Sequence, residues 1–514
     1  MGEPSVKSNA PAGTQAGTPT ATPAGTHAPE STRTALLLSF LERYTTVSVY
    51  AVSNVVLSRL LTPHDTGLFT LGFALTVMIG TLRDFGVGTY IIQEPTLTDV
   101  KWRTALGVSG LTCAVVLAAV VVASFVAGHV YADPDVTKVM LISGLTLTMI
   151  PFSALVLAYL RREMRYGVLY RIALLGAVGQ SIVTMVLAWY GEGAMSMAWG
   201  SVANSVVVVI GSIGHRPRQF GYRPTLAAWR PIAGLGVYST IGTVCHEVTP
   251  NGSDVFLGRF AGLAALGQFS KGGSLVTFVN QALINAALPV ALSVFAQRRR
   301  AGEPLNDAFL RALTLLSGIT WPAFAGLAVV AAPVIRLLFG SQWEMAIPPS
   351  RLIVVAAMIT SLTALHATVY QAFGAMRARM LVQVAVTPAQ LLVLFVAAHG
   401  TLTQMALGVI ASAAIEFVPS QFMVNRICGT AMRNVGGALL PSAVVAACTV
   451  TGALAAASIV PSSREHIILP LGLALAFGAI GWLIGLAVSR HPLSSEVIKL
   501  VHAIRRRTTR RSPC

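Results

Sequence analysis

A set of ionisable side chains interrupts the apolar stretches of this 514-residue sequence. Ionisable groups at membrane depth cost roughly 2.5 to 3.5 kcal/mol each, so they normally pair with one another or line a hydrated cavity. In such a cavity, cations attract anionic ligands, and carboxylates take up a proton or a cation such as Na⁺. The set consists of three cations and four carboxylates: Arg43, Arg83, Lys271, Glu42, Asp84, Glu247 and Asp254.

Helical periodicity groups these side chains with neutral polar residues. At 100° per residue, Asn54 lies on one polar stripe with two of the charged residues. Gln281 and Asn285 lie on one helix face with Lys271. Lipid would reject such stripes, so we expect four helices to form the walls of a hydrated central cavity. They cover residues 35–60, 66–93, 231–257 and 264–294.

The alternative interpretation of any one of these residues is that it forms a structural ion pair within the membrane and does not line a cavity. The clustering of the set on corresponding helices of two repeated segments favours a functional role for the set as a whole. Glu416 and His366 lie on other apolar stretches and lack this support. We expect a polar packing role for each of these two residues.

The composition identifies a polytopic membrane protein. Hydrophobic residues make up 54% of the chain, charged residues 11%, and the mean hydropathy is +0.70. A soluble domain would carry about 25% charged residues. Many uncharged runs exceed the roughly 20 residues that cross a bilayer as a helix. We therefore predict an all-α membrane protein with about fourteen transmembrane helices, over 35–60, 66–93, 104–130, 138–160, 168–190, 194–213, 231–257, 264–294, 309–331, 349–373, 380–399, 404–425, 437–460 and 466–488.

The distribution of basic residues orients these helices. With the N-terminus inside, 27 of the 36 Lys and Arg residues lie in predicted cytoplasmic segments, as the positive-inside rule requires. Both termini are therefore expected in the cytoplasm. The net charge of +17 then faces an anionic leaflet and does not indicate nucleic-acid binding.

Residues 39–75 are echoed at an offset of 200 in residues 239–275, with nine identical positions. Six predicted helices precede the second copy, so both copies enter the membrane in the same direction, the arrangement of parallel transporter repeats. We predict two pseudo-symmetric six-helix lobes followed by two additional helices. The expected divisions are a disordered cytoplasmic tail at 1–33, lobes at 34–215 and 216–425, two helices within 426–488, and a basic cytoplasmic tail at 489–514.

Pro250 and Gly252 lie in the middle of the seventh predicted helix. Proline removes a helix hydrogen bond, so we expect a kink there. Two interpretations stay open: a broken helix that exposes carbonyl oxygens to a coupling cation, and a passive bend.

Four stretches resemble the Wzx-type polysaccharide and oligosaccharide-lipid flippases of the multidrug/oligosaccharidyl-lipid/polysaccharide exporter superfamily. Leu57–Phe69 is similar to the family's R-L-L-T-P-x-D-x-G-L turn, and Arg83–Gly88 to the end of its second helix. Ser253–Lys271 resembles its D-x-x-x-L-G-R and A-L-G-x-Y-S-R/K pattern, with Phe269 where Tyr is usual. Leu337–Trp343 resembles its L-L-F-G-x-x-W segment.

This resemblance implies a flippase, not an enzyme. The implied substrate is an undecaprenyl-diphosphate-linked oligosaccharide, moved across the bacterial cytoplasmic (inner) membrane by alternating access of the two lobes. Membrane lipids, a polysaccharide polymerase and a chain-length regulator are the implied partners, and the implied oligomeric state is a monomer. No catalytic residue, metal site or cofactor is expected. No G-x-x-x-x-G-K-[S/T] loop occurs in the chain, which favours coupling to an ion gradient.

The predicted roles combine the resemblance with the polar stripes. We expect the substrate to be bound by Arg43, Arg83, Lys271, Asn54, Gln281 and Asn285. We expect the coupling ion to be bound by Glu42, Asp84, Glu247 and Asp254.

Three other functions are alternatives to a polysaccharide flippase. A drug or cation antiporter of the same superfamily typically has twelve helices and few cations in its cavity. A peptidoglycan-precursor flippase also has fourteen helices. A membrane polysaccharide polymerase would need a large external loop, and the longest external segment predicted here, residues 333–348, is short.

Overall fold

The computed structural model describes residues 32–83, 86–217, 219–221, 223–227, 229–459 and 467–495. Within its helices, the side chains of 32–40, 42, 43, 231, 233–239, 241, 285 and 286 lie outside this description. The predicted tails therefore fall largely outside the described residues. The same holds for Asp84 and for the side chains of Glu42, Arg43 and Asn285.

Fourteen helices of 18 residues or more fill the described part of the chain, joined by one short α-helix and two 3₁₀ turns. Twelve of the long helices are sufficiently long and apolar to cross a membrane; α1 and α8, which carry predicted polar stripes, do not meet that criterion. The elements are α1 (Thr32–Leu60), α2 (Pro63–Gly80), η1 (Thr81–Arg83), α3 (Val87–Gln93), α4 (Asp99–Val130), α5 (Pro134–Arg162), α6 (Tyr166–Trp189), α7 (Ala194–Gly214), α8 (Trp229–Phe260), α9 (Leu263–Arg300), α10 (Asn306–Leu338), η2 (Ser341–Ala346), α11 (Ile347–Phe373), α12 (Met376–Ala398), α13 (Leu402–Cys428), α14 (Met432–Ile459) and α15 (Ile468–Val488).

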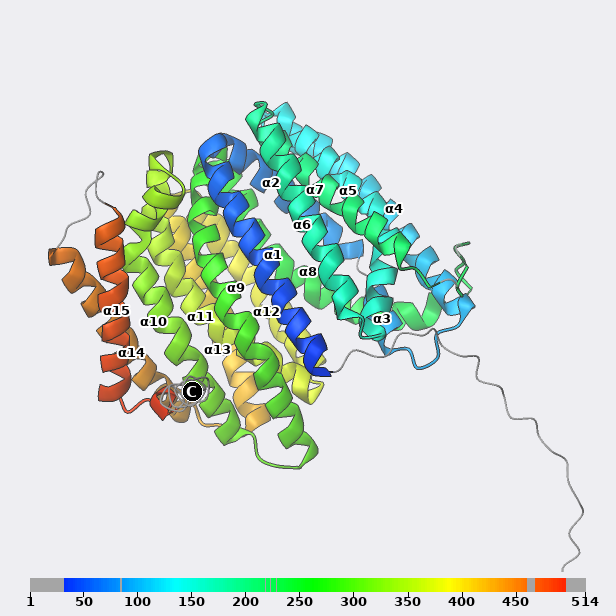
Figure 1. The fold of residues 1–514 in the computed structure, drawn as a ribbon. Coiled ribbons are helices and arrows are strands. Elements are labelled where there is room, and N and C mark those ends of the chain that lie inside the picture. The colour runs from blue at the N-terminus through cyan, green and yellow to red at the C-terminus, as the bar shows by residue number, and fades with distance from the viewer. Residues whose placement is uncertain are drawn as a thin grey trace, which may run out of the picture.

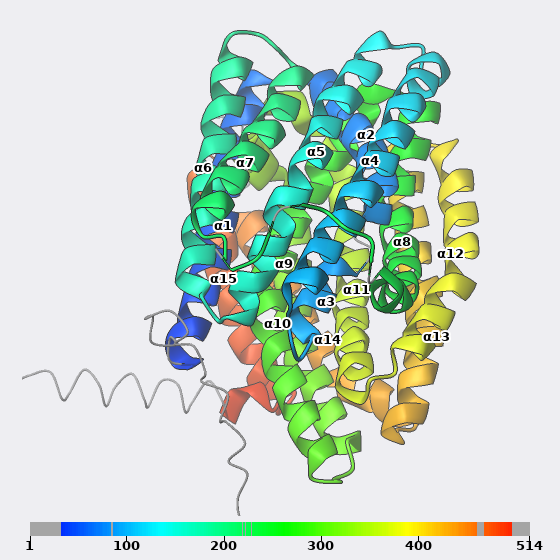
Figure 2. The same cartoon turned by 90° about the vertical axis from the view of Figure 1, so that its right-hand side faces the viewer.

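The helices form two lobes and a C-terminal pair (Figure 1). In the first lobe α6 packs on α1 and α7, and α5 on α2, α4 and α7. In the second lobe α11 packs on α9, α10 and α13, and α12 on α8 and α13. The pair α14 and α15 packs on α10 at the far edge of the second lobe (Figures 1 and 2). The predicted all-α fold is confirmed: it has about fourteen long helices in total, which form two lobes and a C-terminal pair.

The two lobes meet where α2 crosses α9, and the crossing depends on two glycines. A Cβ atom on Gly67 would overlap the Leu263 carbonyl oxygen, and a Cβ atom on Gly267 would overlap the Pro63 carbonyl oxygen. Each such Cβ atom would also lie 2.9 Å from the backbone nitrogen of the other glycine. Because both pairs are related by the offset of 200, the sequence repeat is a pseudo-twofold relation in space.

We call the end of the bundle that carries the α1–α2 turn the outer end, following the orientation predicted from the basic residues. The opposite end is the inner end. At the inner end, the predicted second helix divides into α2, η1 and α3. Gly86, the N-cap residue before α3, has φ of +69°, a left-handed conformation that glycine adopts without steric cost.

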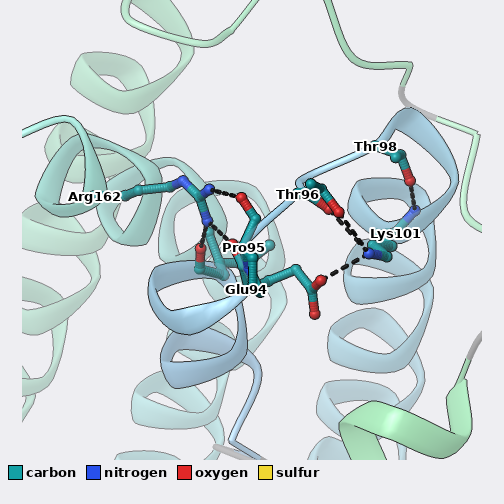
Figure 3. Close-up of polar contacts among 7 residues, drawn as sticks. Glu94, Pro95, Thr96, Thr98, Lys101 and Arg162 are labelled. Carbon is teal, nitrogen blue, oxygen red and sulfur yellow. Dashed lines mark hydrogen bonds and ion pairs between the residues drawn. The ribbon is translucent and has the colours of Figure 1, made fainter. Parts of the chain in front are cut away.

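Arg162 at the end of α5 holds the short α3–α4 connection at the inner end (Figure 3). Its guanidinium donates to the carbonyl oxygens of Ile91 at 2.9 Å, Pro95 at 3.1 Å and Glu94. Lys101 Nζ donates to Glu94 Oε1 at 2.7 Å, and this hydrogen bond holds the pKa of Glu94 below its ordinary value. Arg162 therefore satisfies carbonyl oxygens at the end of α3 and just beyond it, which have no helical partners, and Lys101 pairs with the Glu94 carboxylate.

The connection between the lobes is fixed to α4. Phe220 stacks on Trp102 with ring centroids 5.2 Å apart. The Gly221 nitrogen donates to Asp99 Oδ1 at 2.6 Å, and Arg103 Nε donates to the Arg223 carbonyl oxygen at 2.7 Å. The segment that follows α7 is thus held against α4 of the first lobe before the chain enters the second lobe.

His491, beyond the end of α15, ties the C-terminal pair to the second lobe. Its ring is fully buried, with Nε2 3.1 Å from the Ser442 hydroxyl of α14. A Cβ atom on Gly318 of α10 would collide with the ring, so glycine makes room for it. Burial lowers the pKa of His491 and so favours its neutral form.

Replacing Arg162 by alanine is expected to destabilise the inner end of the first lobe. Three backbone carbonyl oxygens would lose a charged donor, a loss of about 2 kcal/mol. Thermal unfolding of the detergent-solubilised protein measures the effect. Arg161→Ala is the matched control, because Arg161 is the exposed neighbour on the same helix turn. Equal melting temperatures for the two variants would contradict the assigned role of Arg162.

Candidate functional site

Lys271 lies at the contact between the lobes near the outer end. Its side chain is 5% exposed. Nζ donates to Asn54 Oδ1 at 3.2 Å and to Ser58 Oγ at 3.0 Å, both on α1 of the first lobe. Lys271 and Asn54, each predicted to bind the substrate, are thus joined by a direct hydrogen bond.

Two aromatic rings of the second lobe complete the surroundings of this ammonium group. Nζ lies 4.8 Å from the Trp343 ring centroid and 5.2 Å from that of Phe339. Such contacts stabilise a cation by roughly 0.5 to 2 kcal/mol each. No carboxylate of the described residues pairs with Lys271. Within the described part of the chain, the contacts of this buried ammonium group are therefore with neutral oxygens and aromatic faces.

Further hydrogen bonds join the lobes around Lys271. The Trp343 indole donates to the Ser58 carbonyl oxygen at 2.9 Å, and the Gln342 amide donates to the same oxygen and to Leu61. Arg59 Nη2 donates to the Leu337 carbonyl oxygen at 2.7 Å. We call these contacts, together with the Lys271 cluster and the crossing of α2 and α9, the outer seam.

The outer seam follows the pseudo-symmetry of the chain. Thr70 and Ser270, separated by the offset of 200, place their hydroxyl oxygens 3.2 Å apart. On the other side of the axis, the Tyr131 hydroxyl donates to the Val255 carbonyl oxygen of α8 at 2.9 Å. Three of the four stretches that carry the family resemblance, Leu57–Phe69, Ser253–Lys271 and Leu337–Trp343, therefore meet at one interface. In this structure that interface is closed.

A separate cavity of about 620 Å³ lies inside the second lobe, between α8, α9, α11, α12 and α13. Asp254 of α8 and Glu416 of α13 lie on its wall, together with His246. Most other polar groups on the wall are hydroxyl or amide groups: Thr249, Ser253, Ser270, Ser274, Thr277, Asn280, Thr360, Gln383, Gln390 and Ser412.

One amide organises the inner part of this cavity. Gln390 donates to the Ser412 carbonyl oxygen at 3.1 Å and to Glu416 Oε2 at 3.5 Å, and its own oxygen accepts from Thr249 at 3.2 Å. Carboxylate, amide and hydroxyl oxygens of this kind are suitable ligands for a proton or a hard cation such as Na⁺. The described residues contain no group of three or more His, Cys, Asp or Glu side chains placed to hold a metal ion.

The helix α8 is continuous through Pro250, so the structure supports a bend over a broken helix. Asn251 Nδ2 donates to the Glu247 carbonyl oxygen at 2.7 Å and lies 3.4 Å from the Glu247 carboxylate. These bonds span Pro250, whose missing N–H weakens the helix ladder there. Glu247 is thereby engaged within its own helix, and it does not line the cavity.

The remaining predicted residues lie apart from this cavity. Arg83 ends η1, which contacts α4 and α8, so it lies near the lobe contact at the inner end. Its guanidinium is half-buried and has no ion pair in the described chain. Gln281 is exposed on α9. The stripe expected to face water on α1 is partly used for packing, because Tyr50 and Ser53 bond Gln180 and Ser181 of α6 at 3.1 and 2.6 Å.

Glu416, for which the sequence predicted a polar packing role, shares a cavity with Asp254. The repeat covers only the first two helices of each lobe, so it gave no support to a residue of α13. The available signal was a lone carboxylate within an apolar helix. For His366 the expected packing role agrees with its contacts: its ring is fully buried between the Ser420 hydroxyl at 3.1 Å and the Gln421 oxygen at 2.8 Å.

An apolar groove of about 420 Å³ runs between the second lobe and the C-terminal pair. Its wall includes Leu327 and Val330 of α10 and Leu475 and Trp482 of α15. Val279 of α9 also reaches it, so α9 borders both this groove and the cavity of the second lobe.

Comparison with curated proteins finds relatives in polysaccharide biosynthesis. The chain is 25% identical over 312 residues to the lipopolysaccharide biosynthesis protein WzxC of Escherichia coli (strain K12), covering 60% of this chain and 63% of that protein. It is 23% identical over 329 residues to the succinoglycan biosynthesis transport protein ExoT of Rhizobium meliloti (strain 1021), with the same coverage of 60% and 63%. The matches therefore span somewhat less than two thirds of these relatives.

Solved structures share the fold. The lipid II flippase MurJ in an inward closed conformation superposes with a TM-score of 0.70 at 11% identity, over 89% of this chain and 99% of that one. An inward-facing multidrug resistance MATE family transporter superposes with a TM-score of 0.58 at 13% identity, over 76% and 98%.

The family model described as polysaccharide biosynthesis protein matches residues 56–348. That segment is more than half of the chain and contains all the motifs that carry the sequence resemblance, which is thereby confirmed. The chain belongs to the polysaccharide biosynthesis protein family.

Proposed function

We propose that this protein is a flippase that moves undecaprenyl-diphosphate-linked oligosaccharides from the inner to the outer face of the bacterial cytoplasmic membrane. The observation that carries the proposal is the outer seam, in which equivalent residues of two repeated lobes form a closed contact. The relatives named as a succinoglycan biosynthesis transport protein and a lipopolysaccharide biosynthesis protein support the substrate class. The fold shared with a lipid II flippase is compatible with it.

In this proposal, residues 34–215 and 216–425 rock against each other as two rigid lobes. The contact of Gly67 with Gly267 lets the backbones slide without interlocking side chains. The neutral partners of Lys271 form a contact that can be broken without separating an ion pair. Both chain termini lie in the cytoplasm, as the basic residues indicate.

The proposed substrate is bound by cations at two depths. Arg83 lies toward the inner end and Lys271 at the outer end, with Arg43 as a third cation on α1. Opening the outer seam removes Asn54 and Ser58 from Lys271, so its three N–H donors become free for a diphosphate oxygen. Asn54, Gln281 and Asn285 are the proposed partners of glycan hydroxyl groups.

The prenyl tail remains in apolar surroundings while the headgroup crosses. The groove between α10 and the C-terminal pair supplies a site for it, because its wall is almost entirely apolar. The polar headgroup would then pass on the other side of α9, nearer the lobe contact.

The proposed driving force is an ion gradient that acts on the cavity of the second lobe. Asp254 and Glu416 are the proposed ion ligands, because both lie on the wall of this cavity. Glu42 and Asp84 are also proposed to bind the coupling ion, on the basis of the sequence alone. Glu247 supports α8 beside the cavity. Ion binding would change the packing of α8 against α12, and α8 also contacts α2 at the lobe interface.

A disulfide across the outer seam is expected to stop transport. In the double variant Thr70→Cys with Ser270→Cys, oxidation should join the lobes, since the native oxygens are 3.2 Å apart. Complementation of a host deletion strain, with lipid-linked intermediates quantified by mass spectrometry, should then show export below about a tenth of the reduced level. Reductant should restore it. Either single cysteine variant is the control, and undiminished export by the cross-linked protein would refute the alternating-access proposal.

Asp254→Asn and Glu416→Gln are expected to remove the dependence of transport on the ion gradient. Because the neutral amides can neither take up a proton nor neutralise a bound cation, the transport rate in proteoliposomes should fall by roughly tenfold. The measurement compares rates across imposed Na⁺ and proton gradients. Glu192→Gln, an exposed change in the α6–α7 turn, is the control. Retention of full gradient dependence by both cavity variants would exclude this cavity as the coupling site.

A further inference from the structure

A second cavity of about 140 Å³ continues from the large cavity of the second lobe toward the inner end. The two cavities share Glu416, His246, Thr360 and Gln383 on their walls. Arg379 of α12 lies on the wall of the smaller cavity. One guanidinium and one carboxylate of neighbouring helices therefore face a common space.

The contacts between α12 and α13 set the relative depth of these groups. Gln390 bonds Ser412 and Glu416, which aligns the middle of α12 with the middle of α13. Arg379 comes eleven residues before Gln390, about 16 Å closer to the inner end at 1.5 Å per residue. It therefore lies between Glu416 and the inner end, on the path by which an ion would leave the cavity.

Arg379 differs from several arginines near the inner end in the surroundings of its guanidinium. Arg162 donates to three carbonyl oxygens, Arg299 donates to the Ala372 carbonyl oxygen at 2.6 Å, and Arg103 lies 3.6 Å from the Asp99 carboxylate. Within the described part of the chain, the half-buried guanidinium of Arg379 forms no hydrogen bond or ion pair. A cation in a small protein cavity is stabilised when an anion is opposite it.

We infer that Arg379 supplies the counter-charge for Glu416 when the cavity holds no transported cation. This inference rests on the proposed ion coupling at Asp254 and Glu416. After the ion leaves, the flexible guanidinium extends through the small cavity and neutralises the Glu416 carboxylate. A returning ion displaces it, so Arg379 acts as a positioning residue that lowers cation affinity and speeds ion release.

Other ionisable groups surround Glu416 and bear on any ion titration. His246 and Asp254 face it from α8, and Tyr370 from α11, on the walls of the two cavities. His366 of α11 lies behind this wall and bonds Ser420. The residues of α9 that line the larger cavity are uncharged. Among the described residues, Arg379 is thus the one cation on the two cavity walls, apart from His246 when that ring is protonated.

The test measures cation binding by the purified full-length protein in nanodiscs. Tryptophan fluorescence and melting temperature are followed against NaCl, with choline chloride as the ionic-strength control, and against pH in choline buffer. In Arg379→Gln, the cation concentration at the half-maximal response should be at least about threefold lower than in the native protein, whether the cation is Na⁺ or a proton. Arg379→Lys should restore most of the native midpoint. Arg377→Gln, an exposed change two residues earlier on the same helix, should leave it unchanged.

Three outcomes separate this inference from the proposed function. A native protein that responds to neither cation defeats the ion coupling and the inference together. A native response with an unchanged or higher midpoint in Arg379→Gln overturns only the inference, and Arg379 is then a basic residue that anchors the inner end. In Glu416→Gln, further replacement of Arg379 by glutamine should have no added effect on the midpoint.

Poor folding of Arg379→Gln would also be informative. If an unneutralised Glu416 carboxylate is the cause, the double variant with Glu416→Gln should melt at the same temperature as Glu416→Gln alone. A double variant that unfolds at lower temperature would show a structural role for Arg379 and would overturn the inference.

Discussion

The close backbone contact of α2 with α9 is the constraint on which the rest of the molecule depends. Gly67 and Gly267 allow the two helices to touch at an approach that any Cβ atom would prevent. The approach brings the α1–α2 turn against η2 and the end of α10, which in turn buries Lys271. Because the two glycines are equivalent in the repeat, one duplicated segment supplies both sides of the contact.

In the proposed mechanism, the surroundings of Lys271 allow this contact to open and close. A buried ion pair is costly to separate because each charge would be left without its partner. Here the ammonium is held by an amide oxygen, a hydroxyl and two aromatic faces, so separation of the lobes exposes one hydrated cation and neutral groups. The same side chain that stabilises the closed outer end is then available to an anionic headgroup when that end opens.

Much of the fold followed from sequence patterns, because membrane helices are determined by long apolar runs and by the distribution of basic loops. The repeat predicted that the two lobes correspond, and Gly67 and Gly267 now show the axis between them. The candidate site was harder to predict. Helical periodicity gave the polar face of α9, but the partners of Lys271 come from α1 and from the segment before α11, which sequence spacing cannot relate. The sequence predicts only a packing role for Glu416 because its neighbours Asp254 and Gln390 lie on other helices.

Spin-label distances between the lobes test the central claim that the outer seam opens and closes around Lys271. The labels are attached to cysteines introduced by Glu192→Cys and His399→Cys, which replace exposed residues in outer turns of the first and second lobe. The native cysteines are first replaced by alanine, so that only these two sites carry a label. The account predicts a short-distance population in this protein and a shift toward a second, longer-distance population when Lys271→Met is added. An identical single-distance distribution in both proteins, with and without Na⁺, would contradict it.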